Sequence, residues 1–185
     1  GYAVSWRVYN AQHVLPQMRS RIFIVGLRSD LEEGQVADAF AWPDLSDTRP
    51  KLLDVLHGYS DDVSDRDLEP YRLTAQQWSD ISSSAYFQER PEHRLPPLDG
   101  VANVIRGSYR TGWKLYSQFV PIASAGSEDT NYSAELGQPP FRFLTPRECL
   151  RLQGFPEDFK VSGGSGAEIE KVPESSQYQA IGNAV

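Results

Sequence analysis

The sequence predicts an α/β protein, because two strand patterns near its start are followed by two capped, amphipathic helix patterns. The 185 residues are about one domain long, and 39% of them are apolar, which is enough to build one hydrophobic core. The strand patterns lie within residues 1–28, and the helix patterns lie at residues 73–81 and 145–154. The middle of the chain mixes aromatic residues with proline and glycine, which predicts an irregular region.

The first strand pattern covers residues 2–9, where large apolar side chains occupy every second position. The second covers Arg21–Gly26, a short continuous run of β-branched and aromatic residues that ends at a glycine. Such a run is typical of a strand that is covered on both faces of a helix-flanked sheet. Because two strands do not make such a sheet, we expect further strands beside them.

The formal net charge of −7 argues at first sight against binding to nucleic acid, but the acidic residues are concentrated in one region. Residues 28–70 hold 12 Asp or Glu against 4 Lys or Arg, and predict a loop-rich segment with one short helix behind Pro50. The apolar face of that helix consists of Leu52, Leu53, Val55 and Leu56. Two basic stretches, residues 1–27 and 90–114, flank the acidic segment.

A helix is predicted at residues 73–81, with Thr74 as its N-cap and with Trp78 and Ile81 on its buried side. The serines that follow end it. Residues 85–140 predict a small irregular domain with two short β-like pieces, at Val101–Ile105 and Leu115–Ile122.

The clearest local signal is a capping box, in which Thr145 caps a helix, Pro146 takes its first position and Glu148 completes the box. This helix is expected to end at Gly154. The chain then continues with a flexible, linker-like loop and a helix-like final segment, at residues 162–167 and Ser175–Val185.

Several classes of protein are excluded by composition. The single cysteine, Cys149, cannot form an internal disulfide or build a structural zinc site alone, and we predict no metal site. No apolar run approaches the roughly 18 residues of a membrane span, and no secretory signal opens the chain. We therefore expect a soluble, intracellular protein without a membrane partner.

Two groups of residues are candidates for chemistry. Arg19 and Arg21 lie two residues apart at the entry of a strand, so both project from one face, and such a pair suits a phosphate, a carboxylate or the carbonyl edge of a base. Residues 105–114 interleave cations, glycines, hydroxyls and rings, as a DNA-contacting loop does, although a polar hairpin has the same composition. The candidate DNA-binding residues in this stretch are Arg106, Ser108, Tyr109, Arg110, Thr111 and Lys114.

Three motifs in order resemble the C-terminal half of cytosine-5 DNA methyltransferases. The first runs from Gly1-Tyr2 through Asn10-Ala11 to Pro16-Gln17-x-Arg19-x-Arg21-x-Phe23-Ile24-Val25-Gly26. The second is Arg142-x-Leu144-Thr145-Pro146-Arg147-Glu148-Cys149-x-Arg151-Leu152-Gln153-Gly154-Phe155-Pro156, and the third is Ile181-Gly182-Asn183-Ala184-Val185.

The resemblance implies a division of the chain. Residues 1–28 are expected to be strands of a Rossmann-like methyltransferase sheet, and residues 29–141 a small mixed α+β target recognition domain. Residues 142–160 are expected to be the helix that joins the two domains. Residues 161–185 are expected to be a loop and a closing segment beside S-adenosyl-L-methionine, the methyl donor.

The resemblance also implies roles for single residues. It assigns Arg21, and with less weight Arg19, to the pocket of a cytosine flipped out of double-stranded DNA, and it assigns Asn183 and Val185 to the donor pocket. The residues expected to act as scaffold are Arg142, Thr145 and Glu148. Cys149, on the same helix, is expected to be a small packed residue and not the nucleophile.

The sequence departs from the family pattern in ways that matter for activity. It contains no Pro-Cys nucleophile, no Glu-Asn-Val acid motif and no Phe-x-Gly-x-Gly donor loop. We therefore expect the chain to be inactive alone and to need a complementary polypeptide, as a subunit of a split enzyme or as a piece of a single-chain enzyme. His13 stands in a stretch where relatives have Tyr-Gly-Val. Val104-Ile105 stands where relatives commonly have a threonine followed by an aliphatic residue, so this chain lacks that hydroxyl. A lone histidine is more often structural than catalytic, so we expect His13 to be structural.

Two other functions stay open on the sequence. The first alternative is a module that binds DNA without turnover. The second is a tRNA-directed relative, because an RNA-methylating branch shares the motifs. The expected location is the bacterial cytoplasm, at the nucleoid, or the nucleus in a eukaryote.

Overall fold

The structure is a computed structural model that describes residues 1–28, 30, 40–59, 63–122, 139–160 and 172–184. Its strands are β1 (Tyr2–Asn10), β2 (Ser20–Arg28), β3 (Phe119–Pro121) and β4 (Phe141–Phe143). Its α-helices are α1 (Asp65–Leu68), α2 (Ala75–Ser82), α3 (Ala85–Glu89), α5 (Pro146–Leu152) and α6 (Glu174–Asn183). Its short 3₁₀ helices are η1 (Ala11–His13), η4 (Leu52–Val55), η5 (Glu69–Tyr71) and η6 (Pro91–His93).

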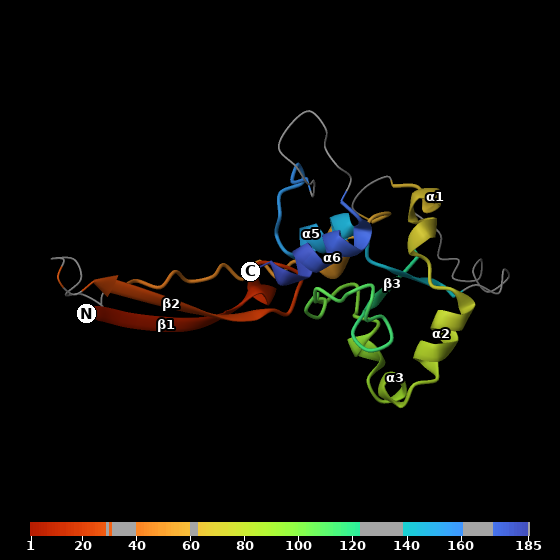
Figure 1. Cartoon of the computed structure of the whole chain (residues 1–185), viewed down its shortest axis with the longest axis horizontal. Coiled ribbons are helices and arrows are strands. Elements are labelled where there is room, and N and C mark those ends of the chain that lie inside the picture. Colours follow the sequence, from red (N-terminus) through yellow and green to blue (C-terminus); the bar gives the residue numbers. More distant parts are fainter. Residues whose placement is uncertain (29, 31–39, 60–62, 123–138, 161–171, 185) are drawn as a thin grey trace.

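Strands β1 and β2 form a long antiparallel ribbon that projects from the rest of the molecule (Figure 1). The register runs from Tyr2 opposite Arg28 to Asn10 opposite Ser20. Because side chains alternate across a strand, the ribbon has two distinct faces. Its first face is apolar and uncovered by the described residues. It consists of Tyr2, Val4, Trp6, Val8, Ile22 and Ile24, which are all exposed.

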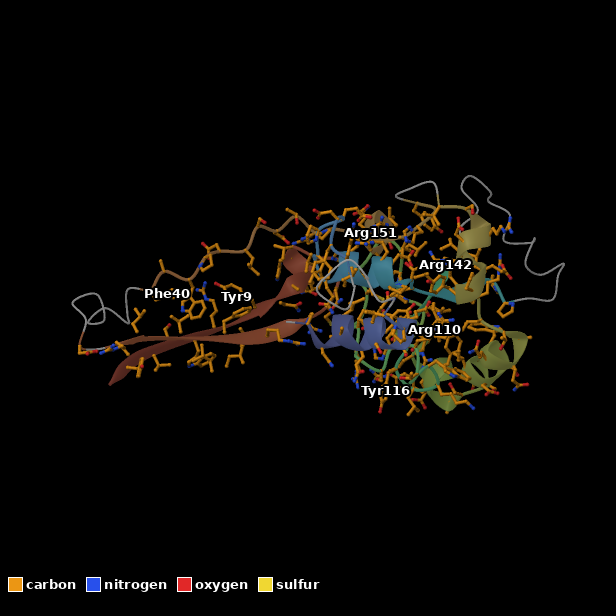
Figure 2. The ribbon with its side chains drawn as sticks, turned by 45° about the horizontal axis from the view of Figure 1, so that its top comes forward. Tyr9, Phe40, Arg110, Tyr116, Arg142 and Arg151 are labelled. Carbon is orange, nitrogen blue, oxygen red and sulfur yellow. The ribbon has the colours of Figure 1, made fainter. Side chains whose placement is uncertain are left out.

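The second face of the ribbon is covered by residues 40–48, which we call the strap. Trp42 donates its indole N–H to the Ser5 hydroxyl at 2.8 Å, and the Tyr9 hydroxyl donates to the Pro43 carbonyl at 2.5 Å. The rings of Phe40 and Trp42 pack edge to face, with centroids 4.9 Å apart. Figure 2 shows Tyr9 and Phe40 together above the ribbon. The strap thus shields the face from which Tyr9 and Arg21 project.

The hydrophobic core lies in the globular part of the molecule, which comprises the described residues from Leu52 onward. Helices α5 and α6 pack together there, beside the small antiparallel sheet of β3 and β4. Tyr109 and Tyr178 hold the same backbone unit of this core, because Tyr109 accepts the Leu144 N–H at 2.9 Å and Tyr178 donates to the Leu144 carbonyl at 2.7 Å. The largest fully buried apolar side chains are Tyr109, Tyr178, Phe119, Phe143, Leu52 and Leu56.

One buried ion pair organises this core. Arg142 and Glu148 are both fully buried, and the Arg142 guanidinium binds the two carboxylate oxygens of Glu148 at 2.8 and 2.7 Å. Glu148 also accepts the backbone N–H groups of His57 and Thr145, each at 2.7 Å, so its carboxylate is saturated. Arg142, Thr145 and Glu148 therefore have structural roles in the core, as the family resemblance implied.

Several predicted elements are confirmed. Both N-terminal strands are present, and η4 is the short helix predicted behind Pro50. Helix α2 begins after Thr74, which forms a capping box with Gln77, and helix α5 begins after Thr145 in the same way. Gly154 follows α5 with a φ of 78°, a left-handed conformation that suits glycine and ends the helix. The last segment is helix α6.

Three expectations are wrong or only partly right. Val101–Ile105 is not a strand, because Ala102 makes only an isolated bridge to Gln17. In the second β-like piece, only Phe119–Pro121 is a strand. Strand β2 is not covered on both faces, since Ile24 is 65% exposed and no described residue covers it. The predicted linker at 162–167 lies outside the described residues.

Candidate functional site

The paired arginines lie beside a small, mostly apolar pocket of about 210 Å³ at the base of the ribbon. Ring and aliphatic side chains form most of its wall, and Leu45 of the strap closes one side. The lining residues include Tyr9, Leu15, Arg19, Arg21, Phe23 and Leu45. Its volume is below the roughly 300–1,000 Å³ of most small-molecule sites, so it suits a single small ring.

Arg19 is tied into the protein. Its side chain is 6% exposed, and it donates to the backbone carbonyl of Ala184, which follows helix α6. Burial lowers the pKa of Arg19 below the ordinary value, and the nearby Arg21 charge lowers it further. Among the described residues the Nη1 atom of Arg19 has no hydrogen-bond partner. Arg19 thus fixes the end of α6 and retains one donor without an acceptor.

Arg21 is less enclosed. It is half-buried, and its Nη1 atom donates to the Ser20 carbonyl at 2.8 Å. Neither Arg19 nor Arg21 has a carboxylate partner among the described residues, although the two charges repel each other. Two guanidinium groups beside an apolar pocket favour an electron-rich group within it, because no described carboxylate compensates their charge.

The predicted DNA-contacting stretch divides into exposed and internal residues. Its exposed members are Arg106, Ser108, Thr111 and Lys114, to which the structure adds Leu115 and Tyr116 on the same loop. We call residues 106–116 the recognition loop. Figure 2 shows Tyr116 at the edge of the globular part, while Arg110 lies inside it.

Tyr109 and Arg110 are held inside. Tyr109 is 2% exposed and donates its hydroxyl to the Gln118 carbonyl at 2.6 Å. Arg110 pairs with Glu174 of α6, donates to the Pro70 carbonyl at 2.8 Å, and lies over the ring of Tyr71. Both residues connect the recognition loop to the core: Tyr109 is buried, and the Arg110 guanidinium is bound to Glu174 and to the Pro70 carbonyl.

Backbone hydrogen bonds join the first motif to Ala102, which stands shortly before the recognition loop. The Met18 N–H donates to the Ala102 carbonyl, and the Ala102 N–H donates to the Pro16 carbonyl, each at 2.8 Å. These bonds fix the arginine motif only a few residues from the start of the recognition loop. The two predicted groups of chemical residues are therefore brought into one region of the molecule.

The end of helix α6 meets both groups. A methyl group on Gly182 would overlap the peptide bond between Arg106 and Gly107, so only glycine allows this approach. A methyl group on Gly107 would in turn lie 2.8 Å from the Asn183 side-chain oxygen. The last turn of α6 thus packs on the start of the recognition loop, while Ala184 binds Arg19.

Of the two residues predicted to face the methyl donor, Asn183 is exposed at the end of α6 with its side-chain oxygen near Gly107. Val185 lies outside the described residues. None of the clefts described here is lined by Asn183. Asn183 is thus a surface residue beside the recognition loop, and the described residues do not enclose a pocket around it.

Cys149 lies in the core, with 0% of its side chain exposed. Burial raises the pKa of its thiol well above the ordinary value, and the neighbouring Glu148 raises it further. Because the thiolate is the reactive form, this cysteine is not an available nucleophile. His13 contacts Asp47 of the strap at 3.3 Å, which gives it a structural position.

Sequence reasoning missed Tyr116, Arg94 and Leu45. Arg94 is 3% exposed, and it donates to the backbone carbonyls of Trp113 and Lys114 in the recognition loop. Its place in the basic stretch was visible, but its burial was not. A larger cleft of about 440 Å³, near Arg147 and Lys160, touches neither the arginine pair nor the recognition loop.

The described residues contain no cluster of three or more His, Cys, Asp or Glu side chains that could hold a metal ion. None of the helices formed by the described residues is long and apolar enough to cross a membrane.

The profile of the C-5 cytosine-specific DNA methylase family matches residues 1–185, and the chain belongs to this family. Among individual relatives, it is 28% identical over 186 residues to the Type II methyltransferase M.DsaV of Dactylococcopsis salina. It is 27% identical over 195 residues to M.MthTI of Methanothermobacter thermautotrophicus. The chain is covered completely in both comparisons, but it spans 44% and 53% of these two relatives.

Solved structures show the same fold at low identity. The Entamoeba histolytica methyltransferase EhMeth matches the whole chain with a TM-score of 0.63 and 14% identity, over 49% of its own length. The S. pombe Dnmt2 methyltransferase matches with a TM-score of 0.56 and 17% identity, over 52% of its length. The fold is thus that of part of a methyltransferase.

Proposed function

We propose that this chain is the recognition portion of a DNA cytosine-5 methyltransferase, and that it contributes Arg21 to the pocket of a flipped cytosine. The observation that carries the proposal is a pair of arginines beside a ring-sized pocket, neither of which has a carboxylate partner among the described residues. Family membership supplies the reaction class. Exposed cations on the nearby recognition loop supply a surface for the DNA backbone.

Arg21 has the chemistry that this role needs. When a nucleophile adds to a cytosine ring, negative charge develops on the ring carbonyl, and a guanidinium donor placed there stabilises it. Arg21 is the more accessible of the two arginines, because Arg19 is occupied with the Ala184 carbonyl. We therefore assign Arg21 to the base and Arg19 to holding α6 against the pocket.

S-adenosyl-L-methionine supplies the methyl group in this family. We propose that Asn183 forms one edge of its site from this chain and that Val185 continues that edge. The rest of the site, and the thiolate nucleophile, would come from a complementary polypeptide, since the only cysteine of the chain is buried.

The ribbon offers this polypeptide a docking surface. Its uncovered face carries six large exposed apolar side chains, and an apolar patch of this kind marks an interaction site. Among the described residues each strand of the ribbon pairs on one edge only, so the other edge has free backbone groups. A further strand and a covering layer would complete the sheet that the sequence predicted.

The test is Arg21→Ala in the active assembly of this chain with the complementary polypeptide. We expect kcat to fall by about 100-fold or more, as for the loss of one transition-state donor, while duplex DNA affinity is largely kept. Arg28→Ala is the matched control, since Arg28 is an exposed arginine on the same strand. Undiminished turnover of Arg21→Ala would refute the assigned role.

Two alternatives are decided by binding. Competition of duplex DNA against structured RNA separates the proposed DNA enzyme from a tRNA-directed relative. Salt-dependent duplex binding without methyl transfer by any assembly would favour a binding module, for which the exposed recognition loop is the favourable observation. The expected location, with the DNA of the cell, follows from the proposed substrate.

A further inference from the structure

We propose that Arg106 reads a guanine in the target duplex, and that Tyr116 and Gly182 hold it in the reading position. This inference rests on the proposed function and assigns a base to one residue of the recognition surface. It also separates Arg106 from Lys114, to which we assign a phosphate contact.

Arg106 is the cation of the recognition loop that the protein leaves available. It is exposed, and the described part of the structure gives its guanidinium no carboxylate and no hydrogen-bond acceptor. The other two cations of the loop have carboxylate partners. Arg110 binds Glu174 of α6, and Lys114 pairs with Asp80 at 2.9 Å. The Lys114 side chain is 64% exposed, so a DNA phosphate can replace Asp80 as its partner. All five N–H donors of Arg106 thus remain for a ligand.

The Arg106 side chain is nevertheless oriented. Its guanidinium carbon lies 4.6 Å from the centroid of the Tyr116 ring, which is a cation–π contact. Tyr116 is itself 49% exposed, so the stacked pair stands at the surface and borders a cleft of about 250 Å³. The contact with the ring leaves the N–H groups of Arg106 without a hydrogen-bond acceptor among the described residues, so they can still donate to a ligand.

The last turn of α6 packs against the backbone of Arg106. Gly182 packs so closely on the peptide bond between Arg106 and Gly107 that no larger residue fits without displacing it. The same turn of α6 binds Arg19 through Ala184. The position of Arg106 is therefore set relative to the arginine pocket, and this is what sequence reading at a fixed distance from a flipped base requires.

The rest of the loop is rigid as well. Arg94 holds the carbonyls of Trp113 and Lys114, and Ser117 donates to the Tyr109 carbonyl. Tyr116 stands two residues after Lys114, which ends the segment held by Arg94. The stacking partner of Arg106 is thus fixed by buried groups and not by the exposed side chains alone.

The shape of the donor selects the base. A guanidinium edge donates two parallel hydrogen bonds to the O6 and N7 acceptors of guanine in the major groove, and no other base offers this pair of acceptors. A lysine keeps the charge but lacks the planar fork. Lys114, a point charge on a flexible stem, suits a phosphate oxygen, which carries no sequence information.

The experiment selects bound duplexes from a DNA pool with one fixed cytosine and random flanks, using the chain with its complementary polypeptide and also the chain alone. We expect the wild type to enrich guanine at one flanking position. Arg106→Ala and Arg106→Lys should each lose that preference by about tenfold or more, with other positions unchanged. Lys114→Ala should instead weaken all sequences alike and lower the salt dependence by about one counterion.

Three further variants test the positioning. Tyr116→Phe should keep the guanine preference, because the ring remains, whereas Tyr116→Ala and Gly182→Ala should reduce it. A wild-type guanine preference that Arg106→Ala leaves intact would overturn the inference while the proposed function stands. The same holds if the wild type binds duplexes without preference. If no duplex is bound or methylated at all, the proposed function fails and the inference fails with it.

Discussion

Tyr109 shows how a residue that looks suited to DNA contact is used by the core instead. Its hydroxyl donates to the Gln118 carbonyl and accepts the Leu144 N–H, so it joins the end of the recognition loop to the entry of α5. Tyr109→Phe would leave both backbone groups buried without a partner. We expect the free energy of unfolding to fall by about 1–3 kcal/mol, measured by urea denaturation.

The control for this change is Tyr116→Phe, because Tyr116 is 49% exposed. Loss of its hydroxyl should change the free energy of unfolding by less than about 0.5 kcal/mol. Equal stabilities of the two variants would contradict the structural role of Tyr109.

Cys149 provides a second prediction at this scale. Because burial raises the pKa of its thiol and excludes solvent, the native chain should react with a thiol reagent at pH 8 far more slowly than the urea-unfolded chain. The measurement is the rate of thiol modification with and without denaturant. A native rate equal to the unfolded rate would show that the thiol is accessible.

The arginines mark the limit of prediction from sequence at the residue scale. The basic stretch at 90–114 was visible, and so was the paired motif at Arg19 and Arg21. Which guanidinium is engaged depends on distant partners: Arg94 binds carbonyls about twenty residues later, and Arg110 binds Glu174 on the last helix. Sequence spacing carries no information about such contacts.

At the scale of elements, the β ribbon is the feature that departs most from a self-contained domain. Trp6 and Ile24 lie opposite each other on its uncovered face, each 65% exposed. We expect the chain alone to self-associate through this face, and we expect Trp6→Ser to shift it toward the monomer in sedimentation velocity. The matched control is Tyr86→Ser, which removes an exposed ring from α3, in the globular part.

The fold of the isolated chain should change little in Trp6→Ser, since Trp6 is 65% exposed and belongs to no buried cluster of the described residues. A monomeric wild type, or a variant that associates as strongly as the wild type, would count against the ribbon as a docking surface.

Elements with local signals were predicted well, and elements with distant partners were not. Helix α5 follows from Thr145 and Glu148, which are three residues apart and form its capping box. Strand β4 was missed, because Phe141–Phe143 is short and its partner β3 is separated from it by some twenty residues. The same reason explains why a strand was wrongly predicted at Val101–Ile105. Among the described residues, this segment makes an isolated β-bridge from Ala102 to the distant Gln17 and no longer ladder.

At the scale of the whole molecule, buried phenols predict how stability depends on pH. Burial, and then the neighbouring Glu174, raise the pKa of Tyr71 to about 12, and burial also raises the pKa values of Tyr109 and Tyr178. Each phenol therefore binds its proton more tightly in the folded chain than in the unfolded chain, where the pKa is about 10.

Their contribution to stability is complete below about pH 10 and is lost as the pH rises through 10 to 12. The urea concentration at the unfolding midpoint should therefore decrease as the pH is raised from 9.5 to about 11.5. The decrease should be smaller in Tyr71→Phe, which lacks one of the buried phenols. A midpoint that stays constant over this interval would show that the phenols are not buried in the folded chain.

The candidate site also belongs to this scale. The sequence predicted the arginine pair and the DNA-facing stretch separately, and the structure joins them through Ala102, Gly182 and Ala184. That junction was not predictable, because it depends on the meeting of the first motif, the recognition loop and the last helix. The sequence also predicted that β2 is covered on both faces. No described residue covers its first face, which is why Ile22 and Ile24 are exposed.

The most direct test measures transfer of a labelled methyl group from S-adenosyl-L-methionine to cytosine-containing duplex DNA. The assay compares the purified chain, a polypeptide that carries the Pro-Cys and Glu-Asn-Val motifs, and the two together. We predict no transfer by either part alone and transfer by the mixture, lost again with Arg21→Ala. Methyl transfer by this chain alone would contradict the account, because its one thiol is buried.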